Sequence, residues 1–277
     1  MKNKISNGVI NILSVLVYAG VGIITLYLCT LMMRNKVFIL NDEHSLFSKQ
    51  SFHVFLFEII IITFLLIVYF WIEKRLDNRK QIYISRFLFI MGAALTVFIV
   101  LCLQVNPTYD QFNVYYAAQQ MHLGDYTLFQ EGEYLYKYPF QKYLVIYFYW
   151  LIQLFGQNNI IAVQAVNVLW VLVAWLSLYY ISRHIFSNTI LGTTVSIIVF
   201  VPCSFYATFV YGNIVGFALV LAALCLLEIY IKKQKLLCAF ASVLFLTVAM
   251  LLKQLFAIYA VGFIVYILII IYIIIIY

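Results

Sequence analysis

The chain has 277 residues, of which 66% are hydrophobic and only 10% carry a charge, and its mean hydropathy is +1.03. A soluble domain, in which about a quarter of the residues are charged, could not bury this much apolar surface, and a membrane β-barrel would show short alternating segments instead of long runs. The composition predicts an all-α polytopic membrane protein, in which a net charge of +7 is typical of basic cytoplasmic loops and does not indicate nucleic-acid binding.

Eight apolar runs have the length of a transmembrane helix. In chain order they cover residues 9–33, 53–72, 87–105, 160–182, 187–204, 212–231, 236–253 and 255–277. We expect residues 1–86 to form two N-terminal transmembrane helices with a basic cytoplasmic loop, and residues 87–277 to form the transmembrane core. The sequence stops inside its last apolar run at Tyr277, which predicts a chain that continues further in the natural protein.

A ninth run, residues 138–156, is shorter and more polar than the others. If this run crossed the membrane, eight basic residues would lie on the cytoplasmic side and nine outside. If it lies along the outer interface, the division becomes eleven inside and six outside. Because cytoplasmic loops carry the excess of lysine and arginine, the second topology is favoured. It predicts about eight spans and a large outer loop, residues 106–159, that carries in-plane helices.

The outer loop is the longest predicted connection, and its first part is acidic. Residues 106–136 include four carboxylates and no lysine or arginine. Long connections between packed elements are usually functional or disordered, and the many aromatic residues here favour function.

Four polar residues that are far apart in the sequence reach the outer face in this topology. Asp110 lies near the start of the outer loop, and Lys137 follows the loop's polar first part. Asn213 lies at the start of the sixth span, and Lys253 lies at the end of the seventh. A carboxylate can deprotonate an acceptor hydroxyl, while lysines hold a lipid-linked phosphate. Their neighbours Tyr109, Gln111, Tyr138 and Tyr211 are weaker candidates for an acceptor or sugar site.

Each of these residues also has a purely structural interpretation. Asp110 could cap a helix over residues 111–123, and Asn213 could cap the sixth span. Lys137 and Lys142 could be interfacial anchors among tyrosines. The cysteines and histidines lack the spacing of a metal site, so no cofactor is predicted and a divalent metal has no support.

The order of these motifs resembles that of the GT-C superfamily of membrane glycosyltransferases, family 39, which includes protein O-mannosyltransferases and the lipid A aminoarabinose transferase. The resemblance covers roughly residues 87–260. Gln111 stands where family members often carry a second acid, and Asn213 stands where they carry an aspartate. The matching elements are Asp110, Lys137-Tyr138-Pro139, Leu154-Phe155-Gly156, Arg183-His184-Ile185-Phe186 and Lys253.

The resemblance implies a glycosyltransferase in the cell membrane with its active site on the extracytoplasmic side. It would move a sugar from a polyprenyl-phosphate donor to an acceptor, with Asp110 as general base and Lys137 and Lys253 neutralising the lipid phosphate. Membrane lipid and the donor would be its partners. Two alternatives stay open at this point: a transporter or flippase of a lipid-linked or small polar substrate, and a non-catalytic, truncated membrane scaffold.

Overall fold

The computed structural model describes residues 35–39, 45–49, 51–73, 75–103, 105–186 and 203–276, together with residues 23 and 196. Their elements are almost entirely helical, and several helices are long and apolar. The prediction of a helical membrane protein is therefore confirmed. The chain divides into two compact units, Met1–Leu76 and Asp77–Tyr277. The predicted spans 9–33 and 187–204 fall almost wholly outside the described residues.

The described residues of the first unit form helix α2 (Phe52–Glu73) and a small sheet. Helix α2 coincides with the second predicted span within one residue. Strands β1 (Asn35–Ile39) and β2 (Ser45–Lys49) pair antiparallel, with Val37 opposite Phe47. This sheet is a departure from the all-α expectation, because a search for long apolar runs passes over two five-residue strands of mixed composition.

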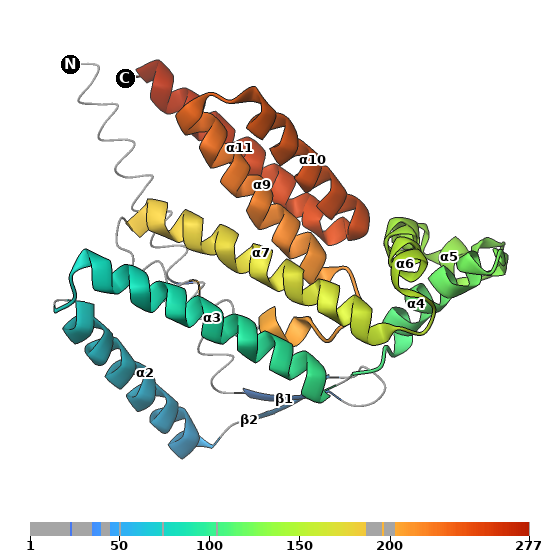
Figure 1. Ribbon diagram of the computed structural model, residues 1–277, viewed down its shortest axis with the longest axis horizontal. Helices are drawn as coiled ribbons and strands as arrows, with labels where there is room; N and C mark the ends of the chain where they lie inside the picture. Colours follow the sequence, from blue (N-terminus) through green and yellow to red (C-terminus); the bar gives the residue numbers. More distant parts are fainter. Residues whose placement is uncertain are drawn as a thin grey trace. The chain divides into compact units, whose positions relative to one another are not determined.

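The described residues of the second unit include five long helices. They are α3 (Asn78–Leu103), α7 (Ile160–Phe186), α9 (Asn213–Lys233), α10 (Leu236–Leu252) and α11 (Ala257–Ile276). In Figure 1, α9 and α10 lie side by side, and α7 lies between α9 and α3. Within the described part of the chain, four helical segments are long and apolar enough to cross a membrane: Arg79–Leu103, Ile160–His184, Asn213–Lys233 and Gln254–Tyr272.

Helix α10 is apolar but shorter than these four. Its 17 residues extend about 26 Å, slightly less than the ~30 Å hydrocarbon core of a bilayer. Gln234 adopts a left-handed conformation with φ 52° at the end of α9. This conformation ends the helix, so that α10 can turn back and pack along α9.

The segment between α3 and α7 consists of short helices. It contains α4 (Tyr109–His122), the 3-10 turns η1 (Thr127–Phe129) and η2 (Pro139–Gln141), α5 (Tyr134–Lys137) and α6 (Lys142–Phe155). The 14 residues of α6 extend only about 21 Å, too short to cross the bilayer. Gly156, with φ 87°, ends α6. That the run 138–156 does not cross the membrane, and that α6 lies in its plane, stay predictions.

One hydrophobic cluster joins these short helices to the long ones. It runs from Val114 of α4 and Phe148 of α6 to Leu219 of α9, Ala249 of α10 and Phe256 of η3 (Gln254–Phe256). In Figure 1 the green helices α4 and α6 lie near the end of the bundle where α7 and α9 begin and α10 ends. The cluster therefore fixes the ends of α9 and α10 against α4 and α6.

At Gly216, helix α9 packs directly against the Phe256 ring. A Cβ atom added there would overlap the buried Phe256 ring, whereas one added at Gly262 of α11 would meet open space. Overpacking of this kind costs about 1–3 kcal/mol. We therefore expect Gly216→Ala to lower the midpoint of thermal unfolding in detergent and Gly262→Ala to leave it unchanged. Adding Phe256→Leu to Gly216→Ala should restore part of the loss, and no recovery would contradict this packing.

Candidate functional site

Asp110, Asn213 and Lys253 come together in the structure. Asp110 lies in the first turn of α4, Asn213 is the first residue of α9, and Lys253 follows α10. The Lys253 ammonium donates a hydrogen bond to Asn213 Oδ1, and Asp110 interacts electrostatically with Lys253. A hydrogen-bonded lysine and amide thus lie within electrostatic range of an acid, where α4 and α9 begin and α10 ends.

The Asp110 carboxylate is positioned by a side chain that sequence reasoning missed. The Tyr134 hydroxyl of α5 donates a 2.7 Å hydrogen bond to Asp110 Oδ1, and Gln141 Nε2 donates a 2.9 Å hydrogen bond to the same hydroxyl. Burial, reinforced by the Asp110 carboxylate, raises the pKa of Tyr134 well above its ordinary value. Tyr134 therefore remains a neutral donor at physiological pH. Asp110 is not the helix cap, because α4 begins at Tyr109 and its N-cap is Thr108.

Tyr109 has an unusual backbone conformation beside this carboxylate. Its φ of 47° lies in the left-handed region, which few residues other than glycine adopt. Such conformations cost about 1–3 kcal/mol and cluster at functional sites. The Tyr109 side chain is exposed, so the strained residue lies at an accessible face next to Asp110.

Lys253 is partly buried and lies against an aromatic ring. Its ammonium nitrogen is 4.4 Å from the centroid of the Tyr211 ring, within the range of a cation–π interaction. Burial lowers the pKa of Lys253, and the Asp110 carboxylate opposes this shift. An anion bound here would meet a positive charge that water screens less than at an open surface.

Buried amides hold the segment that carries Tyr211 and Asn213. Gln164 Nε2 of α7 donates hydrogen bonds to the carbonyl oxygens of Val105 and Thr208, at 2.8 and 2.9 Å. Asn167 Nδ2 donates to the Phe209 carbonyl at 2.8 Å. Both side chains are almost fully buried. They fasten residues 207–209 to α7 and so fix the start of α9.

Gln111 has a similar structural role on the other side of the site. Its Oε1 atom accepts a 3.1 Å hydrogen bond from the backbone amide of Val210. This bond joins α4, one residue after Asp110, to the segment just before Tyr211. Through its Oε1 atom Gln111 therefore helps to position the predicted site residues.

Lys253 lines two pockets. The first, of about 350 Å³, is bordered by Gln141 and Tyr211 and by residues of α6 and η3. The second, of about 310 Å³, reaches from Asn213 along apolar side chains that include Phe217 and Leu255. Lys253 and Leu255 line both, so a polar group on the Lys253 ammonium would lie beside two mostly apolar pockets.

Lys137 and Tyr138 are not joined to this cluster in the same way. Lys137 lies on α5, less than one turn after Tyr134, and no hydrogen bond between described residues links its side chain to Asp110, Asn213 or Lys253. The Tyr138 ring lies 5.0 Å from the Tyr134 ring, measured between centroids. The structure therefore links three of the four predicted polar residues, whereas Lys137 is an exposed residue at the end of α5.

No metal cluster is evident in the described part of the chain, where no group of three histidine, cysteine, aspartate or glutamate residues lies close enough to share an ion. No protein-family model, curated protein or solved structure matches the chain. What this site does must be argued from its geometry.

Proposed function

We propose that the chain is a membrane glycosyltransferase of the GT-C type that moves a sugar from a polyprenyl-phosphate donor to an acceptor at the outer face. The observation that carries this proposal is that the hydrogen-bonded Lys253–Asn213 pair lies close enough to Asp110 for its carboxylate to act on the Lys253 ammonium, although the three residues are far apart in the sequence. A carboxyl group and a lysine at one site suit a reaction that removes a proton and releases an anionic phosphate.

In the proposed reaction Asp110 takes the proton of the acceptor hydroxyl. The acceptor oxygen then forms a bond to the anomeric carbon of the sugar, while the bond from that carbon to the lipid phosphate oxygen breaks. The phosphate leaves with the bonding electron pair as polyprenyl phosphate, and this single displacement inverts the anomeric configuration. Tyr134 holds Asp110 in place through its 2.7 Å hydrogen bond. Lys253 stabilises the departing phosphate.

The donor would use both pockets beside Lys253. Its phosphate would lie on the ammonium, which the Asn213 amide and the Tyr211 ring orient. Its isoprenoid chain would follow the apolar pocket past Phe217 and Leu255, and its sugar would enter the pocket near Gln141 and Asp110's partner Tyr134. Lys137 and Tyr138, which lie near Tyr134, would contact the acceptor. No metal ion is part of this proposal.

The proposed reaction is tested with the purified full chain in vesicles. A labelled polyprenyl-phosphate sugar, a nucleotide sugar and an acceptor mixture from the native membrane are supplied, and label in the acceptor is counted. We expect transfer from the lipid-linked donor and none from the nucleotide sugar. A transporter or flippase would instead move the intact donor between leaflets, and movement without transfer would contradict the proposal.

The proposed side of the site is tested separately by labelling single cysteines in a cysteine-free variant. Glu131 and Lys233 are exposed residues on the outer loop and at the end of α9. We expect an impermeant maleimide added outside intact cells to modify the chain carrying Glu131→Cys and not the one carrying Lys233→Cys. Modification of both from the same side would contradict the topology.

Donor binding should be lost at high pH because Lys253 loses its proton there. A lysine attracts phosphate only while protonated, so the affinity is present below its pKa and is lost as the pH rises through it. Because burial lowers the pKa of Lys253 and Asp110 opposes that shift, the loss should come below the ordinary range of lysine. Asp110→Asn removes the opposing charge and should move the loss to still lower pH. Equilibrium binding of labelled donor between about pH 7 and 11 measures both effects; an unchanged midpoint in Asp110→Asn would be the contrary result.

A further inference from the structure

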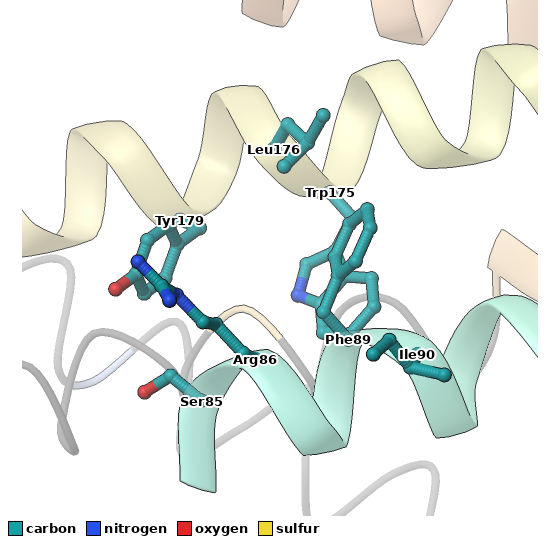
Figure 2. Close-up of a pocket in the computed structure, with 7 residues that line it drawn as sticks. All are labelled: Ser85, Arg86, Phe89, Ile90, Trp175, Leu176 and Tyr179. Carbon is teal, nitrogen blue, oxygen red and sulfur yellow. The ribbon is translucent and has the colours of Figure 1, made fainter. Parts of the chain in front are cut away.

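Another pocket lies between α3 and α7, near the start of α3 and away from the Asp110–Lys253 site. Arg86 is the ninth residue of α3, whereas Asp110 lies beyond the far end of this 26-residue helix. The pocket has a volume of about 320 Å³. Figure 2 shows the side chains that line it, among them Arg86, Phe89 and Ile90 of α3 and Trp175, Leu176 and Tyr179 of α7.

The walls of this pocket are mostly apolar and include two stacked aromatic rings. The Phe89 and Trp175 rings stack with 4.4 Å between their centroids. Trp175 is only 3% exposed, and its indole nitrogen donates a 3.0 Å hydrogen bond to Ser196 Oγ. Ile90 and Leu176, which flank the stack, are 64% and 51% exposed. The pocket is thus a groove whose open side presents aliphatic surface, as a groove filled by a lipid chain would.

One end of the groove is cationic. Figure 2 shows the Arg86 side chain extending from α3 toward Tyr179 of α7. Arg183, one turn after Tyr179 on α7, has its guanidinium carbon 5.8 Å from the centroid of the same ring. Two guanidinium groups therefore border one tyrosine at the end of two apolar helices. Guanidinium groups bind phosphate oxygens in a bidentate manner, and basic pockets between transmembrane helices suit anionic lipid headgroups.

We infer that this groove binds an anionic phospholipid. The headgroup phosphate lies between Arg86 and Arg183, Tyr179 lies at the level of the headgroup, and one acyl chain follows Phe89 and Trp175 down the groove. The charge of the two arginines selects an anionic lipid over a zwitterionic one. This site is independent of the proposed transferase reaction and remains if that proposal fails.

The test uses the fluorescence of Trp175, which forms one wall of the groove. The full chain is placed in phosphatidylcholine nanodiscs that contain a small fraction of phosphatidylglycerol or phosphatidylcholine with brominated chains, which quench tryptophan on contact. The signal of interest is the quenching that Trp175→Phe removes. We expect half-maximal quenching at a clearly lower mole fraction of the brominated phosphatidylglycerol than of the brominated phosphatidylcholine.

Substitutions locate the headgroup. Arg86→Gln and Arg183→Gln should each weaken phosphatidylglycerol binding about fivefold, the effect of one basic residue at an anionic headgroup, and leave phosphatidylcholine quenching unchanged. Arg86→Lys should keep most of the preference. Arg79→Gln, an exposed arginine of α3 that does not line the groove, is the control and should have little effect. Equal quenching by the two lipids, or an equal loss in Arg79→Gln and Arg86→Gln, would overturn the inference.

Discussion

Asp110→Asn is expected to lower the turnover of sugar transfer by about 10²–10⁴-fold, the usual contribution of a general base. The asparagine side chain has almost the same shape, and its Oδ1 atom can still accept the hydrogen bond from Tyr134. The substitution therefore removes the proton acceptor and keeps the local geometry. We expect turnover to fall while the donor KM near neutral pH changes little, measured with a labelled polyprenyl-phosphate sugar in vesicles.

The matched control for this change is Glu131→Gln. Glu131 is an exposed carboxylate of the same acidic segment, and its loss should leave turnover unchanged. The thermal unfolding midpoint of Asp110→Asn should match that of the wild type, which separates a catalytic loss from misfolding. Undiminished transfer by Asp110→Asn would remove Asp110 from the role of general base.

Lys253→Met is expected to lower kcat/KM for the donor by about 10²–10³-fold, the usual cost of losing one group that stabilises a developing anion. Methionine fills much of the space of the lysine stem and cannot neutralise the departing phosphate. It also leaves Asn213 without the donor of its hydrogen bond. Steady-state transfer at varied donor concentration measures this effect.

Lys142→Met supplies a control of the same chemistry. Lys142 is exposed at the start of α6, and its ammonium lies 4.9 Å from the centroid of the Tyr143 ring. Its ammonium faces an aromatic ring as that of Lys253 does, but Lys142 lines neither of the two pockets beside Lys253. Its substitution should change kcat/KM less than tenfold. Equal losses in the two variants would indicate that Lys253 contributes only general positive charge.

Much of the candidate site could be predicted because topology constrains where span ends lie. Lys253 follows one helix and Asn213 begins another, so counting basic residues on each side was enough to predict that they share a face. The same counting predicted that residues 138–156 do not form an ordinary span, and the 14-residue α6 agrees with this. Asp110 was predicted from its place just after an apolar run.

The contacts that position the site could not be predicted in this way. Tyr134 is one of 23 tyrosines, and nothing in its local pattern sets it apart; its bond to Asp110 depends on the fold of the turns between α4 and α5. Gln164 and Asn167 interrupt an apolar helix, which predicts a buried partner but not which carbonyl it serves. The charge of Lys137 made it a candidate, but its contacts depend on the short helix α5, whose last residue it is.

The most direct test of a single Asp110–Lys253 site is a double-mutant cycle of sugar transfer in vesicles, with wild type, Asp110→Asn, Lys253→Met and the double variant. Residues that act together in one step have strongly non-additive effects. We predict a rate for the double variant within about tenfold of the slower single variant. If the two losses multiply, or if no variant differs from the wild type, Asp110 and Lys253 do not form one catalytic site.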